Sequence, residues 1–165
     1  MKGKDFNIVI FGTGGQGQIT LLQILAEAAL LEGFDVKTSE LHGLSQRGGS
    51  VEVHIRFGEK IFSPLVPQSK GNLILALELQ EALKGFYFAN RETNFLVNDY
   101  FSPILGANFS RVKALKILKK LGKKLTLVEA SKICQENLGK EVLAGIFLIS
   151  FASFKNLVPL RPESI

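Results

Sequence analysis

Six residues near the N-terminus have the spacing of a phosphate-binding turn. Residues 12–17 match the pattern G-x-G-x-x-G and directly follow the short apolar stretch 6–11. Glycines permit a tight turn and close approach of the backbone, and the free N–H groups at the start of the next helix attract an anionic group. We therefore take as candidate residues for contact with a cofactor or a partner chain Gly12, Gly14, Gly15, Gln16 and Gly17.

The same glycines also have a purely structural explanation. They would let the first helix pack tightly on the sheet and bind nothing, and motifs of this kind give many false positives. A dinucleotide site also needs an acidic residue near the end of the second strand, to hold a ribose hydroxyl. Glu40 is the nearest candidate, although it lies beyond the spacing of about 20 residues that such sites use. A stand-alone NAD- or FAD-binding oxidoreductase and a structural module without a ligand are the alternatives that follow.

A second polar segment, residues 39–49, is predicted to be a loop at the carboxyl end of a strand. Open α/β sheets bind their ligands at this edge. Arg47 can contact a carboxylate or phosphate with two hydrogen bonds, on a ligand or on a partner chain. An internal ion pair with Glu40 is the structural alternative, and His42 has the alternative of a packing role. The candidates from this segment are Glu40, His42, Gln46, Arg47, Gly48 and Gly49. We assign no catalytic residue and no metal ligand.

The elements that position these segments follow from the hydrophobic pattern. A strand at 6–11, a helix at 19–32 and a strand at 35–38 form a β-α-β unit, which predicts parallel pairing of the two strands with a right-handed crossover. Residues 50–57 alternate between apolar and polar, as in a strand with one buried face. A tight reversal at 58–60 into residues 61–62 predicts an antiparallel hairpin.

The rest of the chain continues the alternation of strands and helices. We expect strands at 73–77, 95–98 and 125–128 and helices at 79–88, 111–121, 129–138 and 142–154. An inserted hairpin turns a mostly parallel sheet into a mixed one. The prediction is an α/β fold in a single domain spanning residues 1–165.

Charge and cysteine content limit the function. The net charge is +5 and the cations concentrate between residues 111 and 124. Lys113, Lys116 and Lys120 recur at helical spacing, which favours a solvated helix face over nucleic-acid binding and leaves docking of an acidic partner open. Cys134 is the only cysteine, so this chain has neither an internal disulfide nor the thiolates for an iron–sulfur cluster.

The termini and the apolar segments predict a cytoplasmic protein. The N-terminal residues run directly into a strand and do not have the pattern of a signal peptide. The most apolar segment, residues 142–154, is shorter than a membrane span. We therefore expect neither a membrane nor a nucleic acid among the partners.

The two polar motifs together resemble the gamma-type subunit of 2-oxoacid:ferredoxin oxidoreductases. The glycine turn is followed in the expected order by E-x-H-G-x-x-Q-R-G-G and an alternating strand. Phe62-Ser63-Pro64-Leu65 with Pro67, and later Leu127-Val128-Glu129-Ala130, match further motifs. The resemblance covers most of the chain and is strongest to the indolepyruvate branch of the family.

This resemblance implies a three-layer α/β/α, Rossmann-like domain and a shared active site. It implies that a larger partner subunit binds thiamine diphosphate with Mg and [4Fe-4S] clusters. Coenzyme A would be the co-substrate, and ferredoxin would take the electrons through the complex. The chain itself would bind no cofactor alone and would be inactive without its partner.

Some residues depart from the family pattern. Gln18, Ile19 and Thr20 are more polar than expected, and Leu41 and Ser45 are variants within the second motif. Relatives continue beyond the position of Ile165, so we expect a C-terminus shortened either by truncation or in a shorter homologue.

Overall fold

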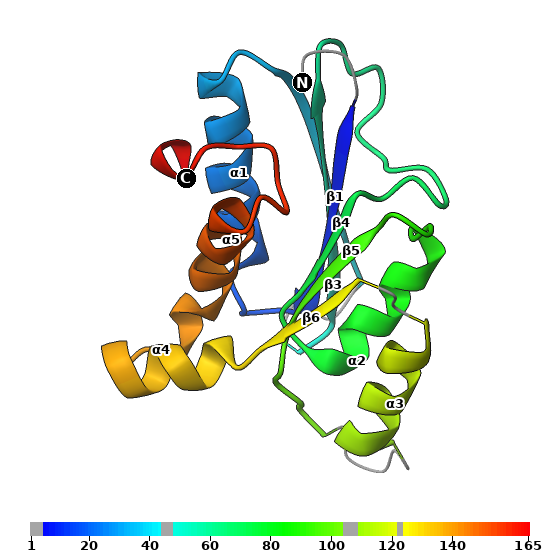
Figure 1. Ribbon diagram of the computed structural model, residues 1–165, viewed down its shortest axis with the longest axis vertical. Coiled ribbons are helices and arrows are strands. Elements are labelled where there is room, and N and C mark those ends of the chain that lie inside the picture. The colour runs from blue at the N-terminus through cyan, green and yellow to red at the C-terminus, as the bar shows by residue number, and fades with distance from the viewer. Residues whose placement is uncertain (1–4, 44–47, 104–108, 122–123) are drawn as a thin grey trace.

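The computed structural model describes residues 5–43, 48–103, 109–121 and 124–165. A six-stranded sheet with the order β2-β3-β1-β4-β5-β6 lies at its centre (Figure 1). Strands β1, β4, β5 and β6 are parallel, while β3 is antiparallel to both β1 and β2. The strands are β1 (Phe6–Thr13), β2 (Asp35–His42), β3 (Ser50–Gly58), β4 (Leu73–Ala76), β5 (Asn94–Asn98) and β6 (Leu125–Val128).

Helices cover both faces of the sheet, which confirms the predicted three-layer α/β arrangement. Helices α1 and α5 lie on one face, and α2 and α3 lie on the other, with α4 joining β6 to the α5 side (Figure 1). The α-helices are α1 (Gln18–Leu31), α2 (Leu79–Ala82), α3 (Arg111–Leu121), α4 (Ala130–Leu138) and α5 (Ala144–Phe154). Short 3-10 helices are η1 (Leu83–Tyr87), η2 (Glu141–Leu143) and η3 (Pro162–Ser164).

Strand β1 shows how one strand serves two cores. Ile8 and Ile10 point toward α1 and α5, while Val9 and Phe11 point toward α2 and α3, and all four are fully buried. Because successive side chains of a strand point to opposite faces, a continuous apolar run is what a strand covered on both faces requires. Because β1 is a central strand of the sheet, the glycines that follow it lie midway along the row of strand ends.

The predicted pairing of the first two strands is wrong. Strand β2 runs in the same direction as β1, but β3 lies between them and pairs with both. The β-α-β pattern gave the direction of β2 and did not reveal that a later strand occupies the neighbouring position. The predicted hairpin of residues 50–57 with 61–62 does not form. The sheet is mixed, as expected, because β3 pairs antiparallel with both β1 and β2.

Three local predictions also need correction. The second strand extends through His42, so the start of the expected 39–49 loop is edge strand. Residues 61–62 form no strand. Side chains of β3 bind the segment that follows: Arg56 Nη1 donates to the Ser63 carbonyl oxygen, and the Val66 N–H donates to His54 Nδ1. The helix expected at 79–88 changes from α2 to the 3-10 helix η1 after Ala82.

No helix within the described part of the chain has both the length and the apolar character needed to cross a membrane.

Candidate functional site

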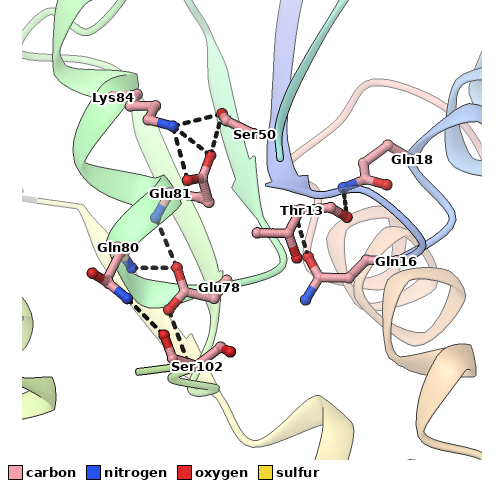
Figure 2. Close-up of polar contacts among 9 residues, drawn as sticks. All are labelled: Thr13, Gln16, Gln18, Ser50, Glu78, Gln80, Glu81, Lys84 and Ser102. Carbon is pink, nitrogen blue, oxygen red and sulfur yellow. Dashed lines mark hydrogen bonds and ion pairs between the residues drawn. The ribbon is translucent and has the colours of Figure 1, made fainter. Parts of the chain in front are cut away.

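The glycine turn between β1 and α1 is held by two glutamine side chains. The Thr13 N–H donates to Gln16 Oε1 over 2.9 Å, and Gln18 Nε2 donates to the Thr13 carbonyl oxygen over 2.8 Å (Figure 2). A Cβ on Gly12 would lie 2.4 Å from Gln18 Nε2 and 2.7 Å from Gln16 Oε1. Gly12 therefore serves internal packing, because the two amide groups occupy the space beside its Cα.

Two later glycines of the turn leave space open instead. Gly15 has φ +101° and Gly17 has φ +83°, and a Cβ at either position would meet no atom within 4 Å. Gly17 is the N-cap of α1, and its carbonyl accepts the Leu21 N–H over 3.1 Å. The N–H groups of residues 18–20 precede that first helical bond and have no partner within the helix. The turn thus combines a backbone that only glycine adopts easily with N–H donors that the helix itself does not use.

One backbone hydrogen bond joins the two polar motifs. The Gly14 N–H donates to the Gly49 carbonyl oxygen over 2.8 Å, and Gly48 next to it has φ +70°. Glu40 and His42 lie at the end of β2, opposite Val53 and Val51 of β3, on the face toward α1. Segments that are far apart in sequence therefore meet at one edge of the sheet.

The remaining two candidates of the second motif, Gln46 and Arg47, lie outside the described residues. The alternative of an ion pair between Arg47 and Glu40 therefore lies outside them too.

A groove beside the turn collects five of the predicted residues. We call it the turn groove; its volume is about 430 Å³. Its lining consists of Gly14, Gly15, Gly17, Gln18, Ile19, Glu40, His42 and Val51. The α1 donors suit an anionic group, and the Glu40 carboxylate accepts hydrogen bonds from hydroxyl groups. This combination matches a ligand that carries both phosphates and a sugar.

A second hollow lies on the other side of the turn, at the carboxyl ends of β4, β5 and β6. We call it the strand-end pocket; its volume is about 240 Å³. Its polar lining is formed by Gln16, Asn98, Tyr100, Ser131 and Glu141. Sequence reasoning identified only Gly15 and Gln16 of this pocket. The available signal was Asn98, a polar residue at the end of the apolar strand β5.

Asn98 fixes the wall of the strand-end pocket. Its Nδ2 donates to the Leu77 carbonyl oxygen over 3.2 Å and to Ser131 Oγ over 2.9 Å. Its Oδ1 accepts the Ser131 N–H over 3.2 Å. Asn98 is only 2% exposed, so its hydrogen bonds connect the ends of β4 and β5 to the start of α4.

A buried carboxylate, Glu78, begins α2 next to the site. Its Oε2 accepts the N–H groups of Gln80 and Glu81 over 2.7 and 2.9 Å, and its Oε1 accepts the Ser102 N–H over 3.2 Å (Figure 2). Burial raises the pKa of the Glu78 carboxyl, and these three donors only partly offset that effect. The side chain is an N-cap whose role is structural.

Glu81 of the same helix braces the second motif. Its Oε2 accepts the Ser50 hydroxyl over 2.6 Å, and Lys84 Nζ lies 2.8 Å from both carboxylate oxygens (Figure 2). Ser50 directly follows Gly49 and pairs with Thr13 across the sheet. We call Ser50, Glu81 and Lys84 the brace; it holds the start of β3 next to Gly49, which contacts the glycine turn. The sequence analysis did not identify these three residues as part of the site.

Within the described ranges, no group of three His, Cys, Asp or Glu side chains is placed to hold a metal ion. Cys134 is buried, and burial raises the pKa of its thiol.

Comparison with known proteins gives a family match over nearly the whole chain. The model of the pyruvate ferredoxin/flavodoxin oxidoreductase family matches residues 7–165. The indolepyruvate oxidoreductase subunit IorB of Thermococcus kodakarensis is 37% identical, over 98% of this chain and 83% of that protein. IorB of Archaeoglobus fulgidus is 38% identical, over 79% of this chain and 67% of that protein. The pyruvate/ketoisovalerate oxidoreductases common subunit gamma of Pyrococcus abyssi is 31% identical, over 91% and 78%.

Solved structures show the same fold. The gamma subunit of a keto/oxoacid ferredoxin oxidoreductase from Geobacter sulfurreducens superimposes with a TM-score of 0.67 at 20% identity, over 96% of this chain and 81% of that chain. A 2-oxoglutarate:ferredoxin oxidoreductase from Magnetococcus marinus, solved with 2-oxoglutarate, coenzyme A and succinyl-CoA bound, gives a TM-score of 0.72 at 16% identity. That match covers 99% of this chain and 26% of the Magnetococcus chain.

Proposed function

Because the chain belongs to the pyruvate ferredoxin/flavodoxin oxidoreductase family and is a subunit of a 2-oxoacid:ferredoxin oxidoreductase, we propose that its complex oxidises indolepyruvate. The observation that carries this proposal is the ranking of the relatives. Two subunits named for indolepyruvate are 37% and 38% identical, whereas the pyruvate/ketoisovalerate subunit is 31% identical. Family membership also rules out the stand-alone NAD- or FAD-dependent oxidoreductase.

The proposed reaction is oxidative decarboxylation. The 2-oxoacid loses carbon dioxide, coenzyme A takes the acyl group, and two electrons reduce ferredoxin. Thiamine diphosphate, when bound, stabilises the carbanion that decarboxylation leaves. The role of cluster carrier does not fit this chain, since four cysteines bind a [4Fe-4S] cluster and the sequence has one. The sequence also has no recognisable motif for the metal ion that accompanies thiamine diphosphate. We therefore assign thiamine diphosphate, Mg and the clusters to a larger partner subunit in the cytoplasm.

We assign the nucleotide end of coenzyme A to the turn groove. Gly15 and Gly17 leave open space beside the first N–H groups of α1, which suit a phosphate. Glu40, on the opposite wall, is placed to accept a hydrogen bond from a ribose hydroxyl. The Magnetococcus protein, one region of which has this fold, was solved with coenzyme A bound, which agrees with coenzyme A as the co-substrate.

In this account the chain binds and orients, and the partner performs the bond-making steps. Gly12, Gln16 and Gln18 keep the turn in one conformation. Glu81 and Lys84 keep Ser50, and with it the second motif, in register. A preformed groove lowers the entropy cost of ordering coenzyme A beside the reacting centre.

The test is anaerobic affinity purification of the chain from its native host, followed by assays with several 2-oxoacids. We expect a co-purifying subunit that contains thiamine diphosphate and iron–sulfur clusters. We also expect a higher kcat/KM for indolepyruvate than for pyruvate or 2-ketoisovalerate. A preference for pyruvate would contradict the substrate proposal. A chain that purifies intact and alone would contradict the proposed partner.

A further inference from the structure

The positive charge of this protein is concentrated on one helix. Between residues 111 and 124 the sequence contains seven Lys and Arg and no Asp or Glu, while the net charge of the whole chain is +5. The remainder of the chain is therefore net negative. Such an asymmetric charge distribution creates a field that attracts anionic partners to one side of the molecule.

Five of these cations lie on helix α3, and all five are exposed. Ala114 and Leu118 are fully buried in the core shared with α2, and α3 lies on the outside of that face (Figure 1). Lys116, Lys119 and Lys120 are exposed. We call these three residues the α3 lysine face.

Ion pairs compensate two of the described cations, Arg111 and Lys124, at the ends of this segment. Arg111 Nη2 lies 2.6 Å from Asp99 Oδ2, and Lys124 Nζ lies 2.6 Å from Glu92 Oε2. Among the described residues, the α3 lysine face has no salt bridge to a carboxylate. Lys116 and Lys120 are four residues apart, a spacing at which like charges destabilise a helix. The sequence of α3 contains no Asp or Glu that could offset this repulsion within the helix.

The side chains around the face argue against a membrane or a nucleic acid as the occupant. Apart from Val112, the apolar residues of α3 with described side chains are buried or half-buried, so no broad apolar face is available for insertion between lipids. The helix has no aromatic residue for stacking on bases, and Arg111 is held by Asp99. An acidic protein surface remains as the partner of matching chemistry.

The type of residue further indicates a transient contact. Lysine is depleted in the cores of protein interfaces, and exposed charges at an interface rim change the association rate and its salt dependence. Complexes between redox proteins are among the smallest and weakest of specific interfaces. A solvated lysine face fits such an encounter better than it fits a permanent subunit contact.

We propose that the α3 lysine face attracts and orients the acidic protein electron carrier that the complex reduces. This rests on the proposed function, in which ferredoxin is the electron acceptor. The lysines carry no electrons themselves. They raise the rate of encounter, and the electrons pass from the clusters of the partner subunit to the carrier.

The experiment uses the assembled complex with K116Q/K119Q/K120Q, because glutamine keeps a helix propensity close to that of lysine. The matched control, K70Q/K132Q/K155Q, removes the same charge from exposed positions outside α3. Each complex is assayed with indolepyruvate and either an acidic ferredoxin or methyl viologen as electron acceptor. The ferredoxin assays are repeated over a range of ionic strength, and gel filtration checks that the subunits remain associated.

We expect the α3 variant to lower kcat/KM for ferredoxin about tenfold at low salt, with a flatter dependence on ionic strength. Its activity with methyl viologen should be unchanged, and the control should stay within about twofold with both acceptors. Unchanged ferredoxin kinetics, or an equal loss in the control, would overturn the proposal. Equal loss with both acceptors, or dissociation of the subunits, would instead assign the face to the larger subunit. An unmodified complex that does not reduce methyl viologen with indolepyruvate would count only against the proposed function.

Discussion

The turn groove and the strand-end pocket lie on either side of one glycine turn, yet they are built in different ways. The groove is lined mainly by two continuous motifs, at 14–19 and 40–42, with one further residue from β3. The pocket collects single residues from the ends of three strands and from the segment that begins α5. The lining of a groove made from continuous motifs can be predicted from the sequence. The lining of a pocket made from strand ends can be predicted only when the order of the strands in the sheet is known.

The two hollows also differ in how their polar groups are used. Asn98, in the wall of the pocket, has three protein hydrogen bonds. The glycines of the groove leave space open, and the first N–H groups of α1 have no partner within the helix. We infer that the pocket wall stabilises the sheet edge and that the groove receives the ligand. Three sets of substitutions test this division and a fourth tests the buried Glu78 beside the site, from the largest expected effect to the smallest.

Replacing Asn98 with alanine should destabilise the fold without changing the KM for coenzyme A. The change leaves the Ser131 N–H and the Leu77 carbonyl without their partner, so we expect the free energy of unfolding to fall by about 2 kcal/mol in urea. Asn137→Ala, which removes a single exposed hydrogen bond to the Ile133 carbonyl, should change it by less than about 0.5 kcal/mol. A raised KM for coenzyme A in Asn98→Ala would show that the pocket takes part in binding.

Gly17→Ala and Gly33→Ala form a matched pair at the two ends of α1. Both glycines have φ near +82°, and a Cβ at either position meets no atom within 4 Å. Each change should therefore cost a similar 1–2 kcal/mol, roughly, of backbone strain. Only Gly17→Ala should raise the KM for coenzyme A, by about tenfold, because it shifts the donors at the start of the helix. Equal KM values in both variants would contradict a ligand at the turn.

Glu40→Gln and Glu141→Gln remove one carboxylate from each hollow. If Glu40 accepts a ribose hydroxyl, its replacement should weaken coenzyme A binding by about 1 kcal/mol, or about fivefold in KM. Glu141→Gln should leave the KM unchanged. The reverse result would move coenzyme A from the groove to the strand-end pocket.

Glu78→Gln should change the pH dependence of stability. Burial raises the pKa of Glu78 above its usual 4.5, so the folded chain holds this proton more tightly than the unfolded chain does. The contribution to stability is then complete below pH 4.5 and is lost as the pH rises through the raised pKa. Urea unfolding between pH 4.5 and 7 should show a smaller loss for the variant than for the unmodified chain. Parallel curves would show that Glu78 does not titrate in this range.

The sequence predicted the parallel part of the sheet well, because its strands are short, mostly apolar runs. Strands β4, β5 and β6 and helix α3 occur where the pattern placed them. The antiparallel part was predicted less well. Ser39, Glu40 and His42 read as a loop because an edge strand keeps few of its side chains buried. The position of β3 between β1 and β2 depends on long-range pairing, which no local pattern encodes.

The same limit applies to the site. Five of the eight residues that line the turn groove were candidates from the motifs alone. The brace formed by Ser50, Glu81 and Lys84 was missed, because its members come from a strand and a helix that are 31 residues apart. No spacing rule links such positions, so only the folded chain brings them together.

The most direct test of the central claim is a titration of the larger subunit with this chain. The rate of coenzyme A-dependent ferredoxin reduction by indolepyruvate is measured as the chain is added under anaerobic conditions. The account predicts almost no activity from either subunit alone and a rate that rises to a plateau at a fixed ratio of the two. Full activity of the larger subunit without this chain would contradict it.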